Sequence, residues 1–159
     1  MLFRSEENPE DGTVRLALAS MKQAEGAGTP AIADYEQILR KAPNNVIALN
    51  NVAWLYFPTD AAKALEHAKR AYDLAPRLAA VADTYGWFLV ETGKVEQGLS
   101  IVRRAARDAP ESLEIQYHYA AALVKSGDKN EARGILEKVV SAEAELDFKA
   151  DAKRLLDSL

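Results

Sequence analysis

Residues 77–110 have the sequence RLAAVADTYGWFLVETGKVEQGLSIVRRAARDAP, which contains the pattern from which the fold can be predicted. Its first half is mostly apolar and ends at Gly93, while its second half is amphipathic and ends at Pro110. Glycine permits the left-handed backbone that closes a helix, and proline cannot continue a helix. The stretch therefore predicts two helices joined by a turn at Gly93.

The same pattern recurs through the chain with a period of 33 or 34 residues, which indicates stacked helix pairs. Four prolines, Pro9, Pro43, Pro76 and Pro110, are separated by 34, 33 and 34 residues. The positions twelve, eight and five residues before the last three prolines share one face of a helix that ends at the proline. The residues found there are Ala31, Tyr35, Ile38, Ala64, Ala68, Ala71, Gly98, Val102 and Ala105, and, in a fourth unit without a proline, Ala132, Leu136 and Val139.

The first helix of each unit carries an apolar residue followed by a small one, which lets a partner helix approach closely. These pairs are Leu18-Ala19, Val52-Ala53, Tyr85-Gly86 and Tyr119-Ala120. Three of the four first helices are followed by a glycine, at positions 26, 93 and 127, so we expect left-handed turns there. The second unit has residues 57–60, Phe-Pro-Thr-Asp, in place of the glycine turn and is one residue shorter, which accounts for the single spacing of 33.

The pattern predicts an all-α chain of about four helix pairs. First helices are expected near 13–25, 45–57, 78–92 and 112–126, and second helices near 30–41, 60–74, 95–108 and 129–141. We expect Thr29 to cap the first of these second helices, with Pro30 in its first turn, and Asp128 to cap the last. Helices of about a dozen residues are marginal alone, so their apolar faces must be buried by neighbouring helices.

The two ends of the chain differ from the repeats. In the tail, one stripe of a helix contains Phe148, Ala152, Leu155, Leu156 and Leu159, which predicts a capping helix within residues 142–159. Residues 1–12 show no second-helix pattern, and we interpret them as a truncated or irregular segment. Two explanations stay open, a fragment of a longer array and a short protein with a ragged start.

Units of this length, with a large-small pair, a glycine turn, a small residue opening the second helix and a terminal proline, resemble the tetratricopeptide repeat. The resemblance covers residues 13–141, with units near 10–43, 44–76, 77–110 and 111–141. It implies a right-handed superhelical solenoid of antiparallel helix pairs. The chain departs from the consensus in one respect. Such repeats often have a tryptophan early in the first helix, and here that position is occupied by Arg15, Leu49, Ala82 and Gln116.

The composition and the motifs argue against an enzyme and against a protein that binds nucleic acid. The net charge is −4, and the basic residues are interspersed with acidic ones rather than gathered in a stripe. There is no cysteine, and His67 and His118 lie in different repeats, so we expect no metal site and no cofactor. The longest apolar stretch, 78–90, is interrupted by Asp83 and is too short for a membrane helix. We therefore expect a soluble chain that is not an enzyme.

The resemblance implies that the first helix of each pair lines a concave groove. Side chains there that flank the large-small pairs are the candidate partner-binding residues, with the two tryptophans at the same place in adjacent repeats. They are Asn50, Asn51, Trp54, Asp83, Thr84, Trp87, Tyr117 and His118. Aromatic side chains provide contact area and amides fix orientation, as a peptide or partner helix requires. The alternative is that Trp54 and Trp87 belong to the core between helices.

The predicted function is a non-catalytic scaffold that binds a protein or peptide in this groove. A groove of acids and aromatics lacks the cations with which some tetratricopeptide domains grip a carboxyl terminus, so docking of that kind is not expected. Residues 48–55, 83–87 and 117–120 resemble bacterial repeat proteins, including those of exopolysaccharide production and the PEP-CTERM sorting system. That resemblance implies an envelope lipoprotein as parent and a periplasmic location, whereas the chain as written would be cytoplasmic. The alternative function is a structural spacer or self-association module of a longer array.

Overall fold

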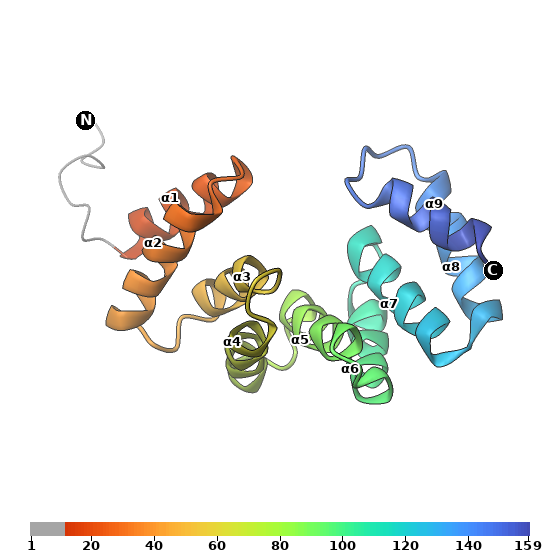
Figure 1. The fold of residues 1–159 in the computed structure, drawn as a ribbon, viewed down its shortest axis with the longest axis horizontal. Helices are drawn as coiled ribbons and strands as arrows, with labels where there is room; N and C mark the ends of the chain where they lie inside the picture. The colour runs from red at the N-terminus through yellow and green to blue at the C-terminus, as the bar shows by residue number, and fades with distance from the viewer. Residues whose placement is uncertain (1–11) are drawn as a thin grey trace. The chain divides into compact units, whose positions relative to one another are not determined.

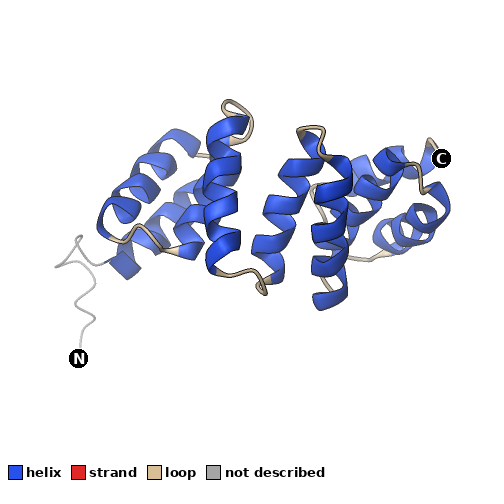
Figure 2. Ribbon diagram, turned by 90° about the horizontal axis from the view of Figure 1, so that it is seen from below, coloured by secondary structure: helices blue, strands red, loops and turns tan. Residues whose placement is uncertain are grey.

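The computed structural model describes residues 12–159, and this range forms nine α helices joined by short loops (Figures 1 and 2). No strand occurs in the described range, which confirms the predicted all-α class. The helices are α1 (Gly12–Ala24), α2 (Gly28–Lys41), α3 (Val46–Tyr56), α4 (Ala61–Leu74), α5 (Ala79–Glu91), α6 (Val95–Asp108), α7 (Leu113–Ser126), α8 (Lys129–Ser141) and α9 (Lys149–Asp157).

Successive helices pack in pairs, α1 with α2, α3 with α4, α5 with α6 and α7 with α8. All twelve positions that keep register with the prolines are buried, from Ala31 in α2 to Val139 in α8. The repeat found in the sequence therefore marks the faces that the helix pairs bury. The large member of the pair in α1, Leu18, differs from its equivalents because it is 45% exposed. Its counterpart Val52 packs against α2, whereas no described helix precedes α1.

The described helices form two compact units, α1–α4 before Pro76 and α5–α9 after it. In the first unit α2 also packs against α3, and the core contains Ala19, Tyr35, Ile38 and Val52. In the second unit α6 packs against α7, α5 also contacts α7, and α9 packs on α8. None of the helices from residue 12 onward is long and apolar enough to cross a membrane.

The helix ends follow the expected chemistry, with one exception. Gly26, Gly93 and Gly127 all have positive φ, between 76° and 95°, and the Asp128 side chain accepts a hydrogen bond from the Glu131 amide at the start of α8. The prediction that Thr29 caps α2 is wrong, because α2 begins earlier, at Gly28, and the residue before it makes no side-chain cap. The tight turn at Gly26 leaves no extended residue between the helices, so Thr29 is already helical.

Candidate partner-binding site

Four of the eight candidate residues meet in the second unit. Asp83 and Trp87 lie one helical turn apart on α5, and Tyr117 and His118 lie opposite them on α7. His118 Nδ1 is 2.8 Å from Asp83 Oδ2, and the indole of Trp87 stacks on the imidazole with ring centroids 4.6 Å apart and planes inclined by 13°. The contact between α5 and α7 thus brings together residues that are 30 or more positions apart in the sequence.

The Asp83–His118 pair is buried rather than open to a ligand. Asp83 is 4% exposed and His118 is 6% exposed. The second carboxylate oxygen, Asp83 Oδ1, is buried without a hydrogen-bond partner in the described structure. Burying a carboxylate costs free energy, and the imidazole contact offsets part of that cost. The pair therefore fixes the imidazole against which Trp87 is stacked.

A pocket of about 470 Å³ opens beside Trp87, between α5, α7 and α9. Its apolar wall combines the exposed parts of two candidate aromatics with aliphatic side chains of α7 and α9. The lining residues are Trp87, Glu91, Tyr117, Ala121, Val124, Lys125, Asp151, Arg154, Leu155 and Ser158. Tyr117 also stacks on Phe148, with ring centroids 5.2 Å apart, next to the first residue of α9. Burial raises the pKa of Tyr117, so its hydroxyl is neutral at pH 7.

The charged residues on the rim of this pocket are paired with one another. Lys125 Nζ lies 2.6 Å from Glu91 Oε1 and 5.7 Å from the centroid of the Trp87 ring. Arg154 pairs with Asp151 along α9. The rim therefore carries two positive and two negative side chains, so it has no net charge, and the pocket suits an apolar or aromatic side chain rather than an ion.

The other candidate residues have different surroundings. Thr84 is buried, and its hydroxyl donates to the Ala80 carbonyl at 2.9 Å within α5. On α3, in the first unit, Asn51 Nδ2 donates to the Tyr35 hydroxyl at 3.1 Å, while Asn50 Oδ1 is buried without a hydrogen-bond partner among residues 12–159. Trp54 is half-buried. Asp83, Thr84 and His118 are therefore buried, although the sequence made them candidate partner-binding residues.

Sequence reasoning missed the part of the pocket that α9 contributes. The predicted capping stripe contains Leu155 but not the other lining residues Asp151, Arg154 and Ser158. The spacing of 151, 154, 155 and 158 is a helical i, i+3, i+4, i+7 pattern, so the sequence shows that they share a face. It does not show that this face turns toward Trp87 and Tyr117.

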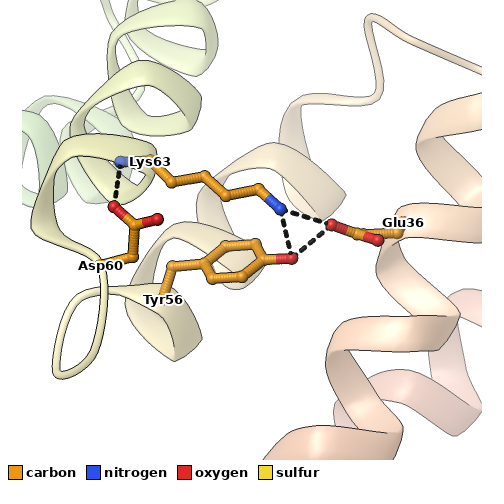
Figure 3. Close-up of polar contacts among 4 residues, drawn as sticks. All are labelled: Glu36, Tyr56, Asp60 and Lys63. Atoms are coloured by element: carbon orange, nitrogen blue, oxygen red, sulfur yellow. Dashed lines mark hydrogen bonds and ion pairs between the residues drawn. The ribbon is translucent and has the colours of Figure 1, made fainter.

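The first unit holds a second polar cluster, in which Glu36, Tyr56 and Lys63 meet from α2, α3 and α4 (Figure 3). Lys63 Nζ donates to Glu36 Oε1 at 2.8 Å and to the Tyr56 hydroxyl at 2.7 Å, and the Tyr56 hydroxyl donates to Glu36. The hydrogen bond from Lys63 has the largest effect on Glu36 and lowers its pKa, and the hydrogen bond from Tyr56 lowers it further. Hydrogen bonds to Glu36 and Tyr56 raise the pKa of Lys63.

Chemically, this cluster is a fixed ion pair. Opposite shifts of the two pKa values keep both Glu36 and Lys63 charged at neutral pH, so neither exchanges a proton there. The adjacent His67 stacks on Tyr56, with ring centroids 5.8 Å apart, and burial lowers the pKa of His67, which keeps its imidazole neutral at pH 7. The cluster links three helices and supports the fold of the first unit.

Residues 89–159 match a family model described as tetratricopeptide repeat. No curated protein matches the chain in sequence. Among solved structures, a thermophilic TPR protein of Thermus thermophilus is similar with a TM-score of 0.78 and 20% identity, over 95% of this chain and 84% of that one. MamA from Desulfovibrio magneticus RS-1 has a TM-score of 0.70 and 18% identity, over 87% of this chain and 79% of that one.

An O-GlcNAc transferase of Thermobaculum terrenum is also similar, with a TM-score of 0.75 and 22% identity. The match covers 88% of this chain but 27% of that enzyme. At these identities the likeness to each solved structure concerns the fold alone, and it carries no activity over to this chain.

Proposed function

We propose that this chain, whose residues 89–159 match the tetratricopeptide repeat model, is a non-catalytic scaffold that binds a segment of a partner protein. The observation that carries the proposal is the pocket between α5, α7 and α9, where Trp87 and Tyr117 form an apolar wall. Binding energy at protein interfaces is concentrated in aromatic anchors that fill such pockets. The bound segment places an apolar or aromatic side chain there and contacts the neutral rim with polar groups on either side.

The bacterial envelope setting is part of this proposal. It rests on the resemblance of residues 48–55, 83–87 and 117–120 to repeat proteins of exopolysaccharide and PEP-CTERM systems. A partner in that setting is a protein or peptide, since the paired charges of the pocket offer no basic surface for nucleic acid.

The test is capture of the partner on the immobilised chain from an extract of the source organism, followed by mass spectrometry. Trp87→Ala removes the anchor wall, so the partner captured by the wild-type chain should be lost. Trp87 is half-buried against His118, so the change should cost about 2 kcal/mol of unfolding free energy and leave the protein folded.

Leu78→Ala is the matched control, because Leu78 is an exposed apolar residue of the same unit that lies outside the pocket. This variant should capture the partner as the wild type does. Equal capture by the Trp87 variant would refute the pocket as the binding site. Concentration-dependent dimers in light scattering, with no captured partner, would favour the alternative of a self-association module.

A further inference from the structure

A second pocket, of about 430 Å³, lies in the same unit between α6, α7 and α8, away from Trp87. Ala106 and Val139, both nearly fully buried, lie at its floor. Around them stand the partly exposed apolar side chains of Leu113 and Ile135 and the loop residue Pro110. Pockets of this size with an apolar lining and a few polar groups are typical of small-molecule sites.

The polar groups of this pocket are positive or neutral. Arg107 on α6 and Lys138 on α8 line it, and no aspartate or glutamate of the described part of the chain does. Within the described residues, the side chains of Arg107 and Lys138 form no hydrogen bond or ion pair. Gln116 is held in place, since its Nε2 donates to the Ala106 carbonyl at 2.8 Å.

The contrast with the pocket beside Trp87 decides the chemistry of the ligand. There the rim has two ion pairs and no net charge, whereas here two cations flank an apolar floor without counter-charges. An anion that also has an apolar body satisfies both features, because its body contacts Leu113 and Ile135 and its head pairs with the cations. A neutral apolar ligand would leave both cations without counter-charges.

We propose that the pocket between α6, α7 and α8 binds a small organic anion, a carboxylate on an apolar chain, whose head pairs with Arg107 and Lys138. The size of the pocket and its floor of buried side chains favour a small molecule over an extended peptide. This site is independent of the partner-binding pocket, with which it shares no residue.

The probe for this proposal is decanoate, with decanol as its neutral counterpart, titrated into the full chain at neutral pH by calorimetry and by nuclear magnetic resonance. Decanoate should bind at least tenfold more tightly than decanol. Its chemical-shift changes should concentrate on residues 106–116 and 135–139, and the indole signal of Trp87 should stay unchanged.

The double variant Arg107→Gln, Lys138→Gln should weaken decanoate binding about tenfold or more and leave decanol binding unchanged. Both side chains are exposed, so the variant keeps the fold. The matched control is Lys129→Gln, Arg133→Gln, which removes the same charge from exposed positions outside the pocket and should bind decanoate as the wild type does. Equal loss in both double variants would show only the effect of net charge and overturn the proposal.

Three other results would also overturn it: no binding of decanoate, equal affinity for decanol, or shift changes centred on Trp87 and Tyr117. The last measurement titrates an acetylated peptide of alternating leucine and aspartate into the same protein. If that peptide binds more tightly than decanoate and loses affinity in the Arg107, Lys138 variant, the site belongs to acidic peptides and the small-molecule assignment fails.

Discussion

At the scale of single residues, burial separates the candidate side chains into two groups. Trp87 and Tyr117 keep exposed surface on the pocket, while Asp83 and His118 lie beneath them and hold Trp87 in place. A rigid aromatic wall loses little conformational entropy when a ligand binds, which favours tight recognition. Asp83 and His118, which the sequence suggested as ligand contacts, therefore support an aromatic side chain from beneath.

The Glu36–Lys63–Tyr56 cluster predicts how the stability of the first unit depends on pH. The folded-state pKa of Glu36 lies below its ordinary value of 4.5, so its stabilising effect is present above that value and is lost as the pH falls. The folded-state pKa values of Lys63 and Tyr56 lie above 10.5 and 10.0, so their effect is present below those values and is lost as the pH rises.

We expect Glu36→Gln to lower the unfolding free energy by about 0.5 kcal/mol at pH 7, since both partners are more than a third exposed. The difference from the wild type in thermal or urea unfolding should shrink below pH 4. Glu66→Gln, at an exposed position on α4, serves as the control and should show no such pH dependence. A difference that persists unchanged at pH 3 would contradict the role given to this ion pair.

At the scale of helices, α5 and α6 approach each other closely at Gly98. A Cβ atom built on Gly98 would lie 2.4 Å from the Gly86 carbonyl oxygen and 2.8 Å from the Val90 amide nitrogen. Both are backbone atoms, so no side-chain rotation relieves the overlap. The small residue that the repeat requires at this place is therefore a packing requirement of the helix pair.

Gly98→Ala should consequently destabilise the chain by about 3 kcal/mol, measured by urea unfolding. Gly134→Ala is the matched control, because Gly134 lies in the interior of α8 and a Cβ atom there would have no neighbour within 4 Å. There alanine should stabilise by about 0.5–1 kcal/mol through its higher helix propensity. A neutral Gly98→Ala variant would mean that α5 and α6 can separate at little cost.

At the scale of the whole molecule, the helices of each unit contact their neighbours along the chain, and stability is distributed over these local interfaces. Helix α9 closes the series. Ala152 is fully buried, and the rest of the predicted stripe, including Phe148 and Leu155, is half-buried. We propose that residues 142–159 cap the repeats, as the stripe predicts.

Deleting residues 148–159 should therefore lower the melting temperature and increase hydrogen exchange in α7 and α8, while exchange in α1–α4 stays as in the full chain. The point variant Ala152→Asp, which places a charge in the buried contact, should reproduce the effect with the chain length unchanged. If protection of residues 113–141 is the same in the truncated chain, α9 is not a cap.

The period, the helices to within about two residues at most ends, the buried faces and the glycine turns could all be predicted from the sequence. This was possible because helix periodicity and backbone conformation are local properties, and the same local pattern recurs in each repeat. The sequence also identified Trp87 and Tyr117 as candidate contacts. The sequence did not predict the start of α2 correctly, because a shift of one or two residues in the preceding turn changes which residue begins the helix.

Tertiary packing, which the sequence did not reveal, buries His118 and Asp83 together under Trp87 and completes the pocket with Leu155 and Arg154 of α9. It also brings Arg107 and Lys138, from α6 and α8, to one largely apolar pocket. The helical pattern shows which residues share a face of one helix. Which face meets which depends on how the side chains of several helices interlock, and this packing is set by residues 30 or more positions apart.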